Sequence, residues 1–358
     1  MQAGSFAPPP QPQPRKGPRT GLIIGIISLL VILIVIGSGI FFLTRGKGST
    51  STTPKPTPSV VHLQITPYTY RGHSDTVNQA VWSPDGKMIA SASSDKTVQV
   101  FDAVTGKLIY TYRGHTNEVH GVAWSPDSKR IASASLDNTV QIWDATTGGH
   151  VVTYTGPSTV LESVAWSPDG TRIATTGGDN NIEVFDPTKP STNITVYKGH
   201  SDVVISIAWS PDSKMIATTS GDKTVQVWDA ATGKTIYTYR GHAASVDIAA
   251  WSPDGKRIAS GADDHMVQIW DATTGANVVT YKGHSNYVVS LAWSPDGKRI
   301  ASGSYDDTVQ VWDLTNPTAT AYTYNGHTDN VYSISWSPDG RYIVSASSDK
   351  TVQVWQPK

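Results

Sequence analysis

All twelve tryptophans of this 358-residue chain fall at two positions of one repeated segment. Seven of them open a Trp-Ser-Pro-Asp stretch that recurs every 42 or 43 residues, and the other five end a Val-Gln-Val/Ile-Trp stretch. Phe101 and Phe185 take the place of the second tryptophan in two repeats. The first set is Trp82, Trp124, Trp166, Trp209, Trp251, Trp293 and Trp336; the second is Trp143, Trp228, Trp270, Trp312 and Trp355. A period of this length indicates an array of like units that bury their apolar faces against one another.

Each repeat reads as four short antiparallel strands. In the second repeat, residues 119–124, 130–135, 140–144 and 151–154 are rich in Val, Ile and Ala and are separated by Pro-Asp and Asp-Asn-Thr turns. Four strands per repeat are typical of one β-propeller blade. The last repeat ends one strand short at Lys358, whereas residues 68–71 match residues 110–113 of the first repeat. We therefore expect this N-terminal strand to complete the seventh blade and close the ring.

On these motifs the segment 63–358 resembles the WD-repeat β-propeller family, in its membrane-anchored bacterial type. The resemblance implies an all-β, seven-bladed WD-repeat β-propeller closed by an N-terminal strand. It also implies that in each blade a Gly-His imidazole, a turn aspartate, a strand hydroxyl and the second tryptophan form a buried hydrogen-bonded network rather than a catalytic site. The expected members are His73, His115, His200, His242, His284 and His327; Asp95, Asp137, Asp179, Asp222, Asp264, Asp306 and Asp349; the five second-set tryptophans; and Ser91, Ser133, Thr175, Thr218, Ser260, Ser302 and Ser345.

The third repeat departs most from this pattern. It has Gly156-Pro157 in place of Gly-His and Phe185 in place of tryptophan, so its network cannot form fully. The first repeat keeps the histidine and the aspartate, but Phe101 has no indole donor. We predict that the third blade is the least rigid of the seven.

Ahead of the repeats the composition changes three times. Residues 1–20 are rich in Pro and Gln and then basic, which predicts a disordered Pro-rich tail. Residues 21–43 carry no charge and are long enough for a transmembrane helix. Residues 44–62 are rich in Ser, Thr and Pro and predict a linker, so the predicted domains are tail, helix, linker and the propeller at 63–358.

A buried soluble helix and a cleaved signal peptide are the alternatives for residues 21–43. The segment has no amphipathic period, is longer than a signal-peptide core and is followed by no Ala-x-Ala-like site, so an uncleaved single-pass anchor is favoured. The cluster Arg15, Lys16 and Arg19 favours a cytoplasmic N-terminus and an extracytoplasmic propeller. Basic residues at 45, 47 and 55 on the other side leave the opposite orientation open.

Composition also excludes several classes of function. The net charge is −1, which argues against general nucleic-acid binding. The chain has no cysteine, so disulfides, thiolate nucleophiles and cysteine-bearing zinc sites are excluded. The sequence contains no His-Glu-x-x-His motif of zinc proteases and no Gly-x-Ser-x-Gly motif of serine hydrolases. It also contains no P-loop lysine between a predicted strand and a predicted helix. We expect a protein that is not an enzyme and needs no cofactor or metal.

Three positions differ among repeats that are otherwise nearly alike. Two of them lie four and six residues before the first tryptophan, and the third lies just before the turn aspartate. The geometry of the family places all three on the face that carries the blade-to-blade loops and the channel mouth, where recognition residues usually lie. Tyr287, Tyr305 and Tyr332 come from neighbouring repeats, and exposed tyrosines are favoured binding anchors. Neutral drift at exposed positions is the alternative. The candidate partner-binding residues are these tyrosines with Leu136 and His120, and an acidic arc of Glu162, Asp247, Asp263 and His265.

The sequence favours a membrane-anchored, non-catalytic protein–protein interaction platform, a scaffold or receptor-like module that binds a protein or peptide at this face. The Pro-rich tail offers a possible second docking segment for a partner. The alternative is an extracytoplasmic small-ligand sensor that signals through a partner, and an enzyme with its site in the channel is the third hypothesis. A wide mouth ringed by Tyr and Asp favours a peptide, whereas a closed pocket of about 300–1,000 Å³ favours a small molecule.

Overall fold

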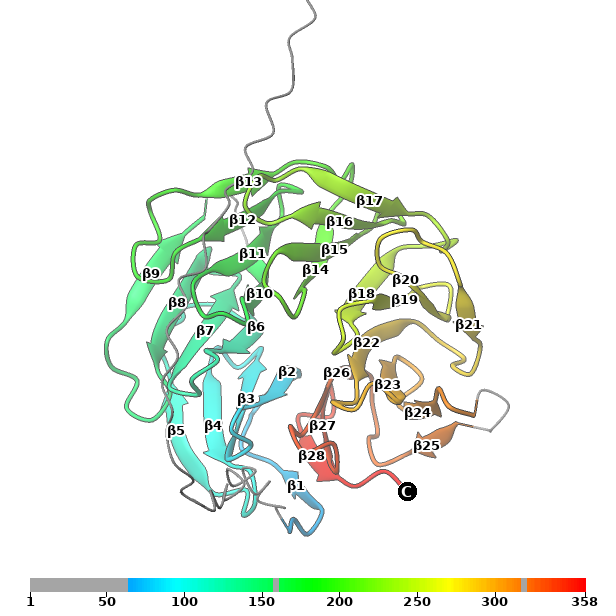
Figure 1. Cartoon of the computed structure of the whole chain (residues 1–358). Helices are drawn as coiled ribbons and strands as arrows, with labels where there is room; N and C mark the ends of the chain where they lie inside the picture. Colours follow the sequence, from blue (N-terminus) through cyan, green and yellow to red (C-terminus); the bar gives the residue numbers. More distant parts are fainter. Residues whose placement is uncertain (1–63, 157–160, 317–320) are drawn as a thin grey trace, which may run out of the picture. The chain divides into compact units, whose positions relative to one another are not determined.

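A computed structural model describes residues 64–156, 161–316 and 321–358. These ranges form 28 β-strands arranged in seven four-stranded antiparallel sheets. The sheets are the blades of a ring, with β2, β6, β10, β14, β18, β22 and β26 innermost (Figure 1). The described ranges contain no helix, and so no helix that could span a membrane. The predicted tail at 1–20, transmembrane helix at 21–43 and linker at 44–62 lie outside the described residues.

The blades follow the chain in order. Blade 1 contains β2 (Val77–Trp82), β3 (Met88–Ser93), β4 (Val98–Asp102) and β5 (Leu108–Tyr112); blade 2 contains β6 (Val119–Trp124), β7 (Arg130–Ser135), β8 (Thr139–Asp144) and β9 (Val152–Thr155). Blade 3 contains β10 (Leu161–Trp166), β11 (Ile173–Gly177), β12 (Ile182–Phe185) and β13 (Thr195–Tyr197); blade 4 contains β14 (Val204–Trp209), β15 (Met215–Ser220), β16 (Val225–Asp229) and β17 (Thr235–Tyr239).

Blade 5 contains β18 (Val246–Trp251), β19 (Arg257–Ala262), β20 (Val267–Asp271) and β21 (Val279–Tyr281); blade 6 contains β22 (Val288–Trp293), β23 (Arg299–Ser304), β24 (Val309–Asp313) and β25 (Tyr322–Tyr324). Blade 7 contains β26 (Val331–Trp336), β27 (Ile343–Ser347), β28 (Val352–Trp355) and β1 (Tyr68–Tyr70). The prediction of an all-β, seven-bladed propeller with four strands per blade is therefore confirmed.

The ring closes through strand β1, as the sequence predicts. Tyr68 and Tyr70 of β1 lie opposite Val354 and Val352 of β28, although the two strands stand at opposite ends of the repeat region. The ring of Tyr70 then stacks on Phe101 of blade 1, with centroids 4.1 Å apart. This exchange joins the first and last blades through backbone pairing as well as side-chain packing, and it leaves β28 no free edge.

Apolar residues are buried mainly between neighbouring blades. One core cluster, for example, joins Val98 and Val100 of blade 1 to Val122 and Trp124 of blade 2. Five first-set tryptophans add an indole hydrogen bond to a carbonyl of the preceding blade: Trp124 to Val81, Trp209 to Ala165, Trp251 to Ala208, Trp293 to Ala250 and Trp336 to Ala292. No blade buries its faces alone, so the blades stabilise one another.

A β-bulge interrupts the innermost strand pair of every blade. The register of β18 against β19, for instance, skips from Val246 to Ile248 and leaves Asp247 unpaired. The skipped residues of the seven blades are Asn78, His120, Glu162, Ile205, Asp247, Val289 and Tyr332. A bulged residue is free of the ladder and its side chain can be re-aimed, here toward the channel. These residues form one of the three variable sets singled out in the sequence.

Candidate functional site

Histidine, aspartate and a hydroxyl are hydrogen-bonded in six blades. In blade 2, His115 Nδ1 lies 2.9 Å from Asp137 Oδ2 and His115 Nε2 lies 2.8 Å from Ser133 Oγ. Trp143 Nε1 donates to the same Ser133 hydroxyl at 3.1 Å. The same His–Asp–hydroxyl arrangement joins His73 with Asp95 and Ser91, His200 with Asp222 and Thr218, His242 with Asp264 and Ser260, His284 with Asp306 and Ser302, and His327 with Asp349 and Ser345.

Charge in this network resides on the aspartate. Burial lowers the pKa of His115 below its usual value despite the neighbouring carboxylate. Burial acts to raise the pKa of Asp137, but hydrogen bonds from Thr139, the Thr116 backbone N–H and His115 outweigh it and lower that pKa. A neutral imidazole therefore donates from Nδ1 to an ionised Asp137 and accepts a hydrogen bond from the Ser133 hydroxyl at Nε2. Each donor finds an acceptor, which is the condition for a structural network rather than a reactive one.

The indole does not join the network in every blade. Trp270, Trp312 and Trp355 donate to Ser260, Ser302 and Ser345 at 3.1–3.4 Å. In blade 4 the hydroxyl belongs to Thr218, and the buried Trp228 Nε1 has no hydrogen-bond partner. The sequence-based expectation that Trp228 would be a hydrogen-bonded member does not match this geometry.

Blade 3 has no histidine network, as its sequence predicts. Thr175 Oγ1 donates to the backbone oxygen of Ser163, and Asp179 accepts from the Asn181 side chain. Phe185 fills the tryptophan slot and stacks on Tyr154, with centroids 4.3 Å apart. Whether this blade is also the least rigid stays a prediction.

A second repeated contact was not predicted from the sequence. Tyr112 stacks on Trp143 with centroids 4.3 Å apart and donates to Gln141 Oε1. Gln141 Nε2 reaches the Gly114 carbonyl at 3.4 Å, and a Cβ on Gly114 would lie 2.3 Å from the tyrosine oxygen. The glycine of the Gly-His pair is thus required by close approach. The recurring Gln two residues before the tryptophan was the signal that could have revealed this contact.

The three variable sets lie on one face, which we call the channel face. All seven bulged residues line a central cavity of about 250 Å³. The second set lies just before the turn aspartate, as Asp263 and Tyr305 do, and the third lies two residues before the bulged residue, as Ser245 and Tyr287 do. Backbone hydrogen bonds of 3.0 Å join these two sets, from Asp263 N–H to Ser245 O and from Tyr305 N–H to Tyr287 O. The same bond joins Ser94 to Thr76, Leu136 to Glu118, Gly221 to Val203 and Ser348 to Asn330. The family resemblance implied only that these positions share a face, and the structure shows that backbone hydrogen bonds join them in pairs.

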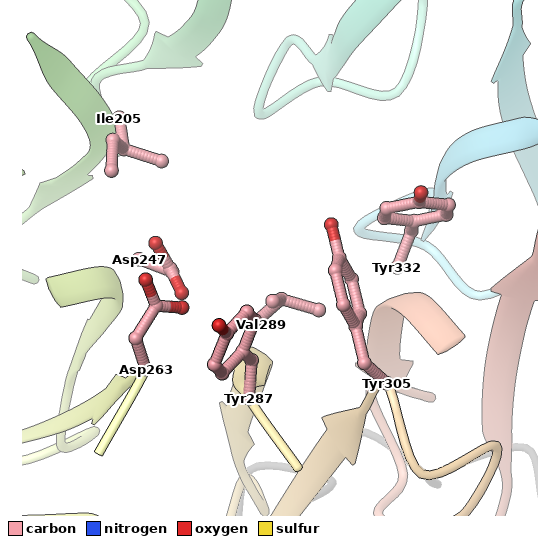
Figure 2. A pocket seen from close by; sticks show the side chains of 7 residues that line it. All are labelled: Ile205, Asp247, Asp263, Tyr287, Val289, Tyr305 and Tyr332. Carbon is pink, nitrogen blue, oxygen red and sulfur yellow. The ribbon is translucent and has the colours of Figure 1, made fainter. Parts of the chain in front are cut away.

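A second cavity of about 400 Å³ adjoins the channel and is lined by residues of blades 4 to 7 (Figure 2). We call it the tyrosine pocket, and its lining residues are Ile205, Asp247, Asp263, Tyr287, Val289, Tyr305 and Tyr332. The Tyr305 ring lies between the other two tyrosines, with centroids 5.8 Å from Tyr287 and 5.4 Å from Tyr332, the latter edge to face. Figure 2 shows the carboxyl groups of Asp247 and Asp263 side by side on the opposite wall.

The carboxyl pair has unusual electrostatics. Burial, a hydrogen bond with Asp263 and the charge of Asp263 together raise the pKa of Asp247 to about 8. Burial and a hydrogen bond with Tyr332 also raise the pKa of Tyr305, so this phenol stays neutral. At neutral pH the pair therefore holds one proton between two carboxyl groups and carries about one negative charge. Perturbed groups that line a cavity mark it as a candidate binding site.

Not every predicted candidate belongs to the tyrosine pocket. His265 lies beside it and packs against the Tyr287 ring at 5.7 Å. Glu162 and His120 line the channel on blades 3 and 2 but not the pocket, and His120 Nε2 lies 3.4 Å from Glu118. Leu136 lines neither cavity. The predicted acidic arc thus separates into a close pair, Asp247 with Asp263, and a carboxylate elsewhere on the channel wall.

The opposite face carries a cavity of about 420 Å³ between blades 5 and 6. Its walls are the Ser-Pro-Asp turns at Ser252–Asp254 and Pro295–Gly297 with Arg257. These residue types recur in the same turns of the other repeats. Within the described ranges, no group of three or more His, Asp or Glu is placed to hold a metal ion. The tyrosine pocket is therefore the stronger candidate site.

Comparison with known proteins agrees with this geometry. Seven segments match the family described as WD domain, G-beta repeat, at residues 65–102, 106–144, 148–186, 191–229, 233–271, 275–313 and 319–356. A 38-residue segment is 50% identical to the Notchless protein homolog of Arabidopsis thaliana, which is 11% of this chain and 8% of that protein. The second likeness is limited to about one repeat and says nothing about the rest of either protein.

Proposed function

The chain belongs to the WD-repeat family, and on that basis we propose that its propeller is a non-catalytic platform that binds a protein or peptide at the channel face. The observation that carries the proposal is the distribution of variation. The Trp-Ser-Pro-Asp turn is the same in all seven repeats, whereas the seven bulged residues are seven different amino acids. Folding does not prescribe those side chains, so their identity is available for recognition.

The shape of the face favours a peptide over an enclosed small molecule. Tyr287, on the wall of the tyrosine pocket, is 41% exposed. The pocket and the central channel share Ile205, Asp247, Val289 and Tyr332, so the two form one continuous surface. An extended chain lying across that surface could place one side chain in the pocket. A small-ligand sensor is the second candidate, and the continuity of the tyrosine pocket with the channel favours the peptide over it.

We further propose that the platform is membrane-anchored, as in the bacterial type that the sequence resembles. The support is the uncharged segment 21–43, followed by the linker at 44–62. The basic cluster at residues 15–19 favours an extracytoplasmic propeller, with the Pro-rich tail on the cytoplasmic side as a possible docking segment. Protease treatment of intact cells with tags at Met1 and Lys358 tests this arrangement. Digestion of only the Lys358 tag supports it, and protection of that tag contradicts it.

The absence of native cysteine allows a direct test of the platform. Single cysteines replace exposed Ser285 or Thr328 in loops of the channel face, or exposed Lys234 or Ala276 in hairpins at the opposite ends of the strands. Each full-length variant carries a photo-crosslinker on its cysteine and is irradiated in an extract of the source cells. We expect discrete protein adducts from S285C and T328C only. Equal adducts from both faces, or adducts from K234C and A276C alone, contradict the proposal.

A further inference from the structure

The carboxyl pair of the tyrosine pocket has a neutral counterpart elsewhere in the same ring. In blade 1 the equivalent positions are Asn78 and Ser94, and Asn78 Nδ2 donates to Ser94 Oγ at 3.1 Å. These two positions are thus in direct side-chain contact, and a donor–acceptor pair satisfies them. Blade 5 places Asp247 and Asp263 there, and no other blade has acids at both positions. The blade itself therefore does not require a carboxyl pair.

Within the described part of the chain, nothing neutralises the pair. Apart from the proton that it shares with Asp263, Asp247 has no close donor: the buried Oδ2 accepts from no other side chain, and Oδ1 has only a 3.5 Å contact from Ser245 Oγ. The groups that act on Asp247 are Asp263 and Ser245, and no Lys or Arg is among them. Two adjacent carboxylates without a cation must share a proton. The carboxyl pair therefore lacks a neighbouring positive charge and has too few N–H or O–H donors for its oxygens.

The opposite wall is suited to a cation as well. The faces of aromatic rings are electron-rich and attract ammonium and guanidinium groups within about 6 Å. Tyr287, Tyr305 and Tyr332 contact one another in series and leave no slot between parallel rings. They form a continuous wall facing the carboxyl pair, with Val289 and Ile205 completing an apolar lining (Figure 2). A side chain with an apolar stem and a charged end matches these surfaces.

We propose that the tyrosine pocket binds one organic cation that bears N–H donors, the ammonium of a lysine or the guanidinium of an arginine presented by a peptide. This inference rests on the proposed function, since it names the group that the platform recognises. The cation donates hydrogen bonds to Asp247 and Asp263, and its stem packs on the tyrosines. The proton that the pair shares in the free protein leaves for solvent, so both carboxylates are ionised in the complex.

N–H donors distinguish this ligand from a quaternary ammonium ion. A trimethylammonium group would satisfy the tyrosine wall but leave the buried Asp247 Oδ2 without a donor. Buried acceptors without partners weaken binding, whereas charge-assisted hydrogen bonds strengthen it. The volume of about 400 Å³ holds either kind of side chain, so chemistry rather than size decides between them.

Four small probes with the same alkyl stem test the inference on the full-length chain in neutral detergent. They are n-butylammonium, n-butylguanidinium, n-butyltrimethylammonium and n-butanol, titrated at constant ionic strength with ligand-observed saturation-transfer NMR. We expect either or both of the first two to bind at least about tenfold more tightly than the last two. Equal or tighter binding of the trimethylammonium probe or butanol, or no binding of any probe, overturns the proposal.

Matched variants come from the ring itself. Asp247→Asn with Asp263→Ser installs the residue pair that blade 1 already uses, and should abolish the preference for N–H-bearing cations. Exposed Asp202 gives the control Asp202→Asn, because blade 6 carries Asn286 at the same loop position. It should keep the preference. Retention of the preference in the double variant, or its loss in Asp202→Asn, places the selectivity outside the pocket and overturns the inference.

The probe experiment tests the cation site and the crosslinking experiment tests the platform, so failure of one proposal can be distinguished from failure of the other. Adducts at the channel face without cation selectivity support the platform and contradict the cation site. Cation selectivity without adducts retains the site but indicates a free amine as ligand, which contradicts the peptide presented in the proposal.

Discussion

Trp143 Nε1 donates a 3.1 Å hydrogen bond to Ser133 Oγ, and its ring stacks on Tyr112. Trp228 occupies the same position in blade 4 and stacks on Tyr197, with centroids 4.7 Å apart, but its Nε1 has no partner. Both tryptophans have 0% exposure. The two sites therefore differ mainly by one buried hydrogen bond.

This pair predicts a difference in stability between two identical substitutions. Trp143→Phe should lower the free energy of unfolding by about 1 kcal/mol more than Trp228→Phe, because only the first removes a hydrogen bond. Phenylalanine fits the slot, since Phe101 and Phe185 occupy it in blades 1 and 3. Urea unfolding of both variants beside the wild type measures the difference. Equal losses would show that the indole hydrogen bond contributes little.

The turn aspartates predict a second contrast. Asp137 is 6% exposed at its side chain and bonds His115, whereas Asp179 of blade 3 is exposed and bonds Asn181. Asp137→Asn should cost about 2–3 kcal/mol, since it replaces an ionised acceptor in a buried network. Asp179→Asn should cost less than about 1 kcal/mol. Denaturant midpoints at neutral pH test both, and a loss at residue 179 as large as that at 137 would contradict the structural role of the histidine.

The carboxyl pair predicts a pH-dependent stability. A folded-state pKa of about 8 for Asp247 lies above the unfolded value of about 3.9, so the folded chain binds the proton more tightly. That contribution is complete below about pH 4 and is lost as pH rises toward 8. The variant with Asp247→Asn and Asp263→Ser lacks it. Its free energy of unfolding relative to wild type should therefore be at least about 1 kcal/mol higher at pH 8.5 than at pH 5.5.

Other titratable groups face this pair and are unchanged in the comparison. Tyr287 and Tyr305 approach from blade 6, Tyr332 from blade 7, and His265 packs on Tyr287. Tyr305 has a raised pKa and does not ionise in this range. The histidine networks are the same in both proteins, so any contribution from them cancels in the difference. A difference that stays constant between the two pH values would contradict proton sharing by the pair.

Closure of the ring predicts a large effect from a short deletion. Removing residues 64–70 deletes β1, the buried Ile65 and the stack of Tyr70 on Phe101. The melting temperature should fall by about 10 °C or more, and the free edge of β28 should promote aggregation. Deleting seven residues at 49–55, ahead of the described propeller, is the length-matched control. Scanning calorimetry and light scattering check both, and an unchanged, monodisperse deletion of 64–70 would contradict closure by β1.

The sequence by itself determined the number of blades, the four strands in each and the closing strand. The number of blades follows from the seven repeats, the strands from alternating apolar residues and Asp turns within each repeat, and the closing strand from the match between residues 68–71 and 110–113. The resemblance to the WD-repeat family implied the histidine and aspartate partners, and the structure pairs them in six blades. Comparison of the repeats also showed which positions vary, and the resemblance to the family implied the face on which they lie.

Only the tertiary structure decided which of the variable residues contact one another and form the tyrosine pocket. The β-bulge that turns Asp247 toward the channel depends on the pairing of two strands, which an alternating pattern alone does not reveal. Tyr305 and Tyr332 meet because neighbouring blades pack at a distance set by the closed ring, while Glu162 is carried to another part of the channel wall. Likewise, Trp228 Nε1 has no hydrogen-bond partner in blade 4, where Thr218 supplies the hydroxyl to the histidine. Repeats specify where a residue lies within its own blade, but contacts between blades are determined by three-dimensional packing.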